Sequence, residues 1–160
     1  MRRFVLSALL AATAFAAPAH AESAAPLSLA DPTAFVARLK AMGYAPDPIA
    51  DKAHPGTAIT VDGAGYMVAF GGCEAGINCK YVVLVGKYSD VKGAPADWIA
   101  KENIDFDYIK VWNDEDKLLT YSTGLVVEGM SADLFKASVD LFVASGNSLA
   151  KDAMDAKLTK

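Results

Sequence analysis

Two cysteines are the residues of this sequence whose type and spacing best support a chemical prediction. Cys73 and Cys79 lie within GGCEAGINC, between the apolar runs 66–70 and 81–85. This pattern is typical of two antiparallel strands joined by a glycine-rich loop, with one cysteine at each mouth of the loop. In an oxidising compartment such thiols pair, and closing so short a loop contributes about 2.4 kcal/mol in the chain-entropy model. We therefore predict a structural disulfide between Cys73 and Cys79.

Other uses of the two thiols fit the sequence less well. A zinc site needs about four ligands, whereas the chain offers two thiolates, the distant His54 and carboxylates. A redox-active pair is usually C-x-x-C at the N-terminus of a helix, and neither feature is present. A regulatory redox pair and two free thiols remain as alternatives. No metal site and no cofactor is predicted.

The remaining candidates for catalysis are isolated from one another. His54 lies in a loop of the form AHPG, without a G-x-S-x-G segment that would indicate a serine nucleophile. Asp105 and Asp107 would share one face of a strand, where paired acids serve acid–base chemistry or simply mark an exposed edge. We prefer the exposed edge and predict that the protein is not an enzyme. A hydrolase that uses these residues is the weakest alternative.

Three further patterns receive structural interpretations. The acidic segment 113–116 lacks the glycine and the later glutamate of a calcium loop, so a hairpin turn is predicted. The close glycines at 63–65 and 71–72 are not followed by a helix, which argues against a phosphate cradle. Most of the large aromatic residues are expected in the core or in cross-strand pairs, and only an exposed patch would make them a partner site. These residues are Tyr66, Tyr81, Tyr88, Trp98, Trp112 and Tyr121.

The elements that position these residues alternate between helices and short strands. A first helix begins at the N-cap Asp31, with Pro32 in its first turn, and ends at Gly43. The short turns between the strands imply antiparallel pairing, and helices are needed to cover one face of the sheet. We predict an α+β fold with an antiparallel sheet of about five strands in the order α-β-β-β-α-β-β-α. The expected strands are 58–62, 66–71, 80–88, 106–112 and 118–127, and the middle helix is 95–103.

The last helix carries the clearest boundary signals. Ser131 is its expected N-cap, and Met130 and Phe135 occupy the two positions of a hydrophobic staple. Gly146 and Asn147 mark a place where the helix would bend or end. We expect residues 152–160 to form a frayed, charged tail. The predicted buried stripe consists of Leu134, Leu141, Phe142 and Leu149.

The N-terminus indicates export. Arg2 and Arg3 precede an apolar run at 4–17 that is shorter than the ~20 residues needed to span a bilayer, and Ala19-His20-Ala21 supplies a cleavage site. We predict a signal peptide at residues 1–21, cut after Ala21, and a periplasmic protein without a stable membrane anchor. The rest divides into a linker at 22–30, a single domain at 31–151 and the tail.

The charge of the mature chain excludes two classes of partner. Removal of two of the 15 Lys and Arg residues leaves 13 against 19 Asp and Glu, which changes the net charge from −4 to −6. Arg38 is the single arginine that remains after cleavage. Such a chain lacks the basic surface on which nucleic-acid binding and anionic-lipid binding depend.

The order of the elements resembles that of the YbjN family, bacterial proteins described as sensory transduction regulators. The resemblance covers most of the mature chain and is carried by Met42-Gly43-Tyr44, the Gly72-Cys73…Cys79 hairpin of exported members and Gly129-Met130-Ser131 before the long helix. Family members often carry an arginine-containing segment after an Asn that Asn103 matches, whereas residues 104–112 are acidic and aromatic here. The resemblance implies a fold like that of type III secretion chaperones.

The resemblance also implies a function without catalysis. We expect a regulator or chaperone-like module that binds another protein, and a homodimer is one form that this binding could take. A binder of a small envelope ligand, held between the sheet and the helices, is the alternative.

Overall fold

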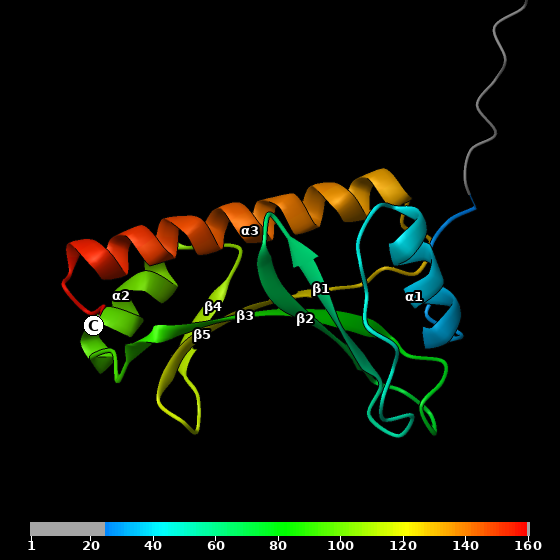
Figure 1. Ribbon diagram of the computed structural model, residues 1–160, viewed down its shortest axis with the longest axis horizontal. Coiled ribbons are helices and arrows are strands. Elements are labelled where there is room, and N and C mark those ends of the chain that lie inside the picture. Colours follow the sequence, from blue (N-terminus) through cyan, green and yellow to red (C-terminus); the bar gives the residue numbers. More distant parts are fainter. Residues whose placement is uncertain (1–24, 160) are drawn as a thin grey trace, which may run out of the picture.

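The computed structural model describes residues 25–159 (Figure 1). The predicted signal peptide, residues 1–21, lies outside the described residues. The helices and strands follow one another in the order that the sequence predicts, and the α+β class is confirmed. The elements are α1 (Pro32–Ala41), β1 (Gly56–Val61), β2 (Ala64–Gly71), β3 (Tyr81–Lys92), α2 (Ala96–Asp105), β4 (Lys110–Asn113), β5 (Leu118–Leu125) and α3 (Ala132–Asp155).

The strands form one antiparallel sheet in the order β1-β2-β3-β5-β4. The first three strands are neighbours in sequence and in space, as expected for strands joined by short connections. After β3 the chain passes through α2 to the far edge of the sheet, forms β4, and returns as β5 between β4 and β3. The prediction of about five antiparallel strands is therefore confirmed.

One face of the sheet is covered by α3, which runs along the whole length of the molecule, with α1 near one of its ends and α2 near the other (Figure 1). Aromatic side chains fill the space between this helix and the sheet. Phe35 of α1 meets Phe135 edge-on, with ring centroids 5.5 Å apart. Tyr121 of β5 stacks on Tyr88 at 5.3 Å and contacts Phe142 at 4.9 Å. Each such pair adds about 0.5–1.5 kcal/mol to the free energy gained by burying its area.

Two glycines make room for Tyr121. A Cβ atom at Gly86 of β3, or at Gly146 of α3, would come within 3.0 Å of three atoms of the Tyr121 side chain. The hydroxyl of Tyr88 donates a hydrogen bond to the backbone carbonyl of Gly146. Gly146 therefore marks a close approach of helix to sheet, and α3 continues through it without ending.

The helix caps are confirmed. The carboxylate of Asp31 accepts a hydrogen bond from the backbone N–H of Thr33 at 2.8 Å. The hydroxyl oxygen of Ser131 accepts a hydrogen bond from the backbone N–H of Leu134 at 3.2 Å. These bonds satisfy backbone donors that have no partner within the first turn of a helix.

The buried stripe of α3 differs from the prediction. Phe142 and Leu149 are buried as expected, but Leu134 and Leu141 are exposed. Successive residues of a helix are about 100° apart around its axis, so each of these leucines points away from the buried phenylalanine that follows it. The buried residues are Phe135, Val139, Phe142, Val143, Gly146, Leu149 and Ala153.

The C-terminal residues are also ordered differently from the prediction. The helix continues to Asp155 with Ala153 fully buried, and the N–H of Leu158 donates to the carbonyl of Ala153 at 2.9 Å. Thr159 then forms an antiparallel bridge with Val91 at the end of β3. The prediction of a frayed tail is wrong for residues 152–159.

The described part of the expected linker, residues 25–30, belongs to the core. Leu27 and Leu29 are 1% and 0% exposed. The N–H of Leu27 donates to the carbonyl of Met130 at 2.8 Å, and the carbonyl of Leu29 accepts from Cys79 at 3.0 Å. This segment therefore joins the disulfide loop to the chain that precedes α3, and the folded unit begins before residue 31.

The segment around Asp105 and Asp107 is not the strand that was predicted for 106–112. α2 continues to Asp105, and the strand begins only at Lys110. Asp105 is paired with Lys101 on its own helix at 2.6 Å, and Asp107 lies in a bend. The two acids therefore do not share the face of a strand.

Candidate functional site

The face of the sheet opposite α3, here called the open face, is the main candidate for a functional surface. Along β3 the buried residues alternate with the half-buried Val83 and Val85. The strand register places Met67 beside Val85 and Ala69 beside Val83. Because the side chains of a strand alternate between the two faces, these four residues lie on the open face.

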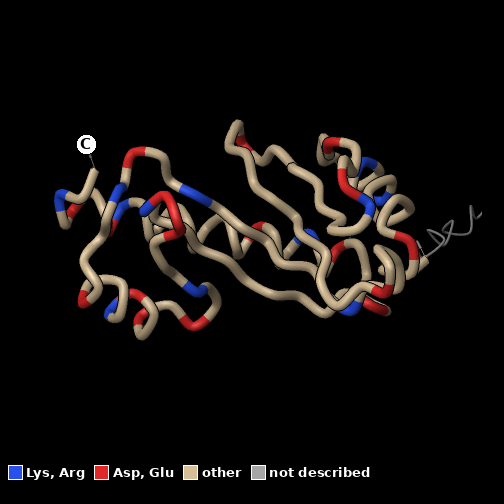
Figure 2. Tube along the Cα trace, turned by 90° about the horizontal axis from the view of Figure 1, so that it is seen from below, with Lys and Arg blue, Asp and Glu red and all other residues tan. Residues whose placement is uncertain are grey.

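The open face is unusually poor in charge. β1, β2 and β5 contain no charged residue, and the charged residues of the other two strands are Lys87, Asp90, Lys92 and Lys110. Figure 2 looks at the molecule from this side and shows few charged residues on the strands in the middle of the sheet. A solvent-facing side of an antiparallel sheet usually carries polar side chains. The apolar residues of this face therefore resemble a surface that a partner covers.

Three shallow hollows follow the open face. One of 350 Å³ contains Met67 and Ala69 and is bordered by Asp47 and Asp51. A second, of 610 Å³, lies where Val83 meets β5 and the segment before β4. The third, of 480 Å³, is lined by Lys87, Trp112 and residues 113–116. In Figure 1 the β4–β5 turn and the loop before β1 extend below the sheet on either side of this face.

An ion pair anchors the acidic turn to the sheet. Lys87 Nζ lies 2.5 Å from Asp114 Oδ2. The hydrogen bond from Lys87 holds the pKa of the Asp114 carboxyl below its ordinary value, and the same bond raises the pKa of Lys87. The other oxygen of Asp114 accepts from the N–H of Leu118 at 2.8 Å, so segment 113–116 is a hairpin turn as predicted. Among residues 25–159, no group of three or more His, Cys, Asp or Glu side chains is placed to hold a metal ion.

Both edges of the sheet are partly closed by the chain itself. At the β4 edge, the side-chain amide of Asn103 accepts from the N–H of Val111 and donates to its carbonyl, both at 2.8 Å. At the β1 edge, the N–H of Asp47 donates to the carbonyl of Ala58 at 3.0 Å. A partner strand that added to either edge would have to displace these bonds. The open face is therefore more accessible to a partner than the edges are.

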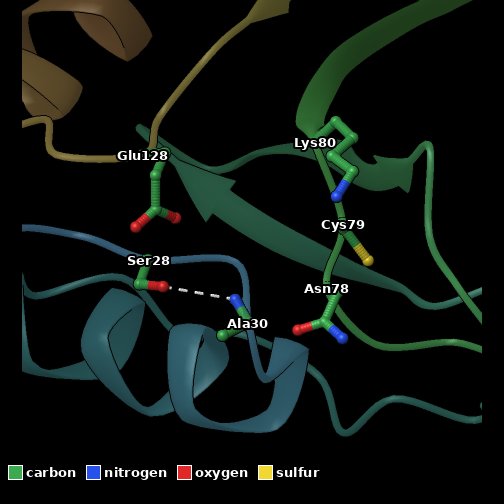
Figure 3. A pocket seen from close by; sticks show the side chains of 6 residues that line it. All are labelled: Ser28, Ala30, Asn78, Cys79, Lys80 and Glu128. Carbon is green, nitrogen blue, oxygen red and sulfur yellow. Dashed lines mark hydrogen bonds between the residues drawn. The ribbon is translucent and has the colours of Figure 1, made fainter.

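The cysteines lie in the loop that joins β2 to β3. The sulfur atoms of Cys73 and Cys79 are 2.09 Å apart, at disulfide-bonding distance as predicted, and this pair fits an oxidising compartment. Figure 3 shows the adjacent hollow of 300 Å³, lined by residues of the N-terminal segment and of the loop. Two of its polar side chains bind the backbone there, because Ser28 Oγ accepts from Ala30 and Glu128 Oε2 accepts from Leu29. This hollow therefore has a structural explanation.

The residues considered for catalysis do not come together. His54 is exposed in the loop before β1, where its Nδ1 lies 3.2 Å from Asp51. Asp105 ends α2, at the opposite end of the sheet (Figure 1). Asp107 lines the second hollow of the open face, without His54 or Asp105.

Most of the large aromatic residues are partly or fully buried, as expected. Tyr66 and Tyr121 belong to the core, whereas Tyr81 is exposed and Trp112 is half-buried on the open face. The aromatic residues do not identify the open face, but another feature of the sequence does. Residues 82 and 84 point to one face of a strand, residues 83 and 85 point to the other, and all four are apolar. This indicates a strand with two apolar faces.

No helix within residues 25–159 is long and apolar enough to span a bilayer. Comparison of the whole chain with models of protein families, with curated proteins and with solved structures finds no match. The resemblance to the YbjN family therefore stays a prediction from the sequence.

Proposed function

We propose that the chain is a non-enzymatic periplasmic protein of the YbjN type, a regulator or chaperone-like module that holds another polypeptide against its open face. The observation that carries the proposal is the apolar, nearly uncharged surface formed by Met67, Ala69, Val83 and Val85. Covering such a surface contributes about 25 cal/mol for each Å² of apolar area removed from water.

The arrangement of the core supports a partner on the surface over a ligand in the interior. Phe35, Phe135, Tyr121 and Phe142 occupy the layer between α3 and the sheet. A small envelope ligand in that layer would have to displace packed aromatic rings. The open face needs no such rearrangement.

Export to the periplasm is supported by two independent features. The N-terminal residues 1–21 have the pattern of a cleavable signal. The paired cysteines suit a compartment in which disulfides persist.

Site-specific photocrosslinking tests the proposal. Met67 on the open face and Leu141 on the outer side of α3 are matched in exposure, at 55% and 50%. A photoreactive amino acid is placed at each position in turn, and the protein is irradiated in the periplasm of cells that express it naturally. We expect a defined crosslinked species from position 67 only, either with another protein or, for a homodimer, at twice the mass of the mature chain.

Position 141 serves as the control because its exposure matches that of position 67. Equal crosslinking from positions 67 and 141 would show contact without preference for the open face. An absence of any adduct at position 67 would contradict the proposed function.

A further inference from the structure

The two ends of the open face are acidic, and this property points to the chemistry of the partner. This inference rests on the proposed function. At the β1 side, Asp47 and Asp51 border the hollow that contains Met67. Asp51 accepts hydrogen bonds from the backbone N–H groups of Ala53 and His54 and from the His54 ring, and these hold the pKa of its carboxyl below the ordinary value. This carboxylate therefore stays ionised over a wide range of pH.

The other end of the open face is the turn between β4 and β5. Asp114 is neutralised by Lys87, but Glu115 and Asp116 are exposed and form no ion pair within the described residues. Trp112 lies beside them in the same hollow. Lys117 follows them in the turn and Asp116 also attracts Lys87, so the three acidic residues 114–116 outnumber two lysines at this end, next to an apolar ring.

Lys110 defines the path between the two ends. The register places it beside Ser122, in the row that contains Val85 and Met67, at the β4 edge. A positively charged residue of a partner would be repelled by Lys110 and attracted to the turn between β4 and β5. A diagonal path from Asp47 to the turn passes over the apolar middle of the sheet and avoids Lys110.

A helix suits this path better than a strand. The side chains and backbone groups that occupy both edges oppose the addition of a strand. On its other face the same sheet already packs against a helix, α3. Five strands spaced by about 4.8 Å span about 19 Å at right angles to the strands, which an α-helix crosses in about 13 residues, and the diagonal path needs a few residues more.

We propose that the partner segment is an amphipathic helix with an uncharged apolar side and with Lys or Arg residues near both ends. The apolar side packs on Val83, Val85 and Met67. The basic ends lie against Asp47 and Asp51 on one side and against Glu115 and Asp116 on the other.

Three synthetic peptides of about 16 residues test this inference by titration of the mature protein at low and at physiological salt. The first has an apolar side and Lys at both ends, the second replaces each Lys by Glu, and the third keeps Lys but has Ser and Gln on the apolar side. We expect the first peptide to bind about tenfold more tightly than the second at low salt, with a smaller ratio at physiological salt. We expect no binding of the third.

The outcomes separate this inference from the proposed function. If the first two peptides bind equally, or the second binds more tightly, basic ends are not recognised and the inference is overturned. The proposal of an apolar partner on the open face is not affected by that result. If the third peptide binds as well as the first, charge alone accounts for the attraction and the inference is overturned. If neither apolar peptide binds, the inference is overturned too, and crosslinking at Met67 decides the proposed function separately.

A charge-matched pair of variants locates the effect. Glu115→Gln with Asp116→Asn removes two negative charges from the turn, and Asp133→Asn with Asp140→Asn removes two from α3 on the other side of the sheet. We expect the first variant to lose several-fold in affinity for the Lys peptide and the second to lose none. Equal losses would show that the net charge of the protein, rather than the rim of the open face, attracts the peptide.

Discussion

Asn103 pairs with both backbone groups of Val111, as a neighbouring strand would. Its Oδ1 accepts from the N–H of Val111 and its Nδ2 donates to the carbonyl, each at 2.8 Å. Nδ2 also donates to the carbonyl of Ile99 on α2 at 2.9 Å. One side chain therefore closes the β4 edge of the sheet and fastens α2 beside it.

Replacement of Asn103 by Ala should lower the free energy of unfolding by about 2–3 kcal/mol, because two partly buried backbone groups lose their partners. Urea denaturation of the mature protein measures this change. Asn147→Ala, at an exposed position of α3, is the control and should alter stability by less than about 0.5 kcal/mol. Similar values for the two variants would contradict the role of Asn103 at the edge.

Gly146→Ala should destabilise the protein although Ala favours helices over Gly by about 1 kcal/mol. The new methyl group would come within 3.0 Å of Tyr121, which is packed between α3 and β3 and cannot withdraw. Overpacking of this kind costs about 1–3 kcal/mol. Thermal denaturation should therefore show a lower Tm for Gly146→Ala and an unchanged or higher Tm for Ser148→Ala, at an exposed position of the same helix. A higher Tm for Gly146→Ala would mean that helix and sheet can separate without loss.

Features encoded within a few residues were predictable from the sequence. The caps Asp31 and Ser131 each bond to a backbone group two or three residues ahead, so the residues needed to identify them are adjacent. The Cys73–Cys79 loop is equally local. The class and the order of the elements follow from such local signals.

Features decided by distant contacts were not predictable. Leu134 and Leu141 form an apolar stripe beside that of Phe135 and Phe142, and the sequence of α3 alone does not show which stripe faces the sheet. Packing against aromatic residues of other elements selects the phenylalanines. Leu29 similarly acquires its role through Glu128, a partner 99 residues away.

The open face was missed for a related reason. Alternation of apolar residues identifies which positions of a strand are buried, but a strand with two apolar faces does not show which of them the helix covers. Val83 and Val85 could be assigned to the open face only after α3 was placed.

Glu102 should make the protein less stable as the pH rises. Its side chain is 1% exposed, its Oε2 has no hydrogen-bond partner within the described residues, and Oε1 lies 3.4 Å from Lys101 Nζ. Burial raises the pKa of this carboxyl above its ordinary value of 4.5, partly opposed by Lys101 and reinforced by Asp152 and Asp105. The folded state therefore binds the proton more tightly than the unfolded state does. The contribution of Glu102 to the free energy of unfolding is therefore greatest below pH 4.5 and is lost as the pH rises through the pKa of the folded state.

Glu102→Gln removes the charge and retains the shape of the side chain. We expect the variant to equal the wild type in acid and to exceed it by about 1–3 kcal/mol at neutral pH, since a buried unsatisfied carboxylate is replaced by a neutral group. Urea denaturation across this range of pH measures the difference. Asp105→Asn, which removes the exposed partner of Lys101, should change stability by less than about 1 kcal/mol. A difference between Glu102→Gln and the wild type that does not vary with pH would rule out titration of Glu102 as its cause.

Reduction of the disulfide should loosen the N-terminal segment as well as the loop that contains the cysteines. The N–H groups of Asn78 and Cys79 donate to the carbonyls of Ala30 and Leu29, each at 3.0 Å. Without the covalent bond the loop gains conformational freedom, which lowers the free energy of unfolding by about 2.4 kcal/mol. Hydrogen exchange at these two amides should accelerate in reductant, whereas exchange at Leu84 in the middle of β3 should change only through the loss of global stability.

The double variant Cys73→Ser, Cys79→Ser separates reduction from other effects of the reagent. In this variant the backbone amides at positions 78 and 79 should exchange fast both with and without reductant. If wild-type exchange at Asn78 is unchanged in reductant, the buried side chains of Leu27 and Leu29 are sufficient to hold the segment in place. In that case the disulfide would contribute to stability without controlling the position of the N-terminal segment.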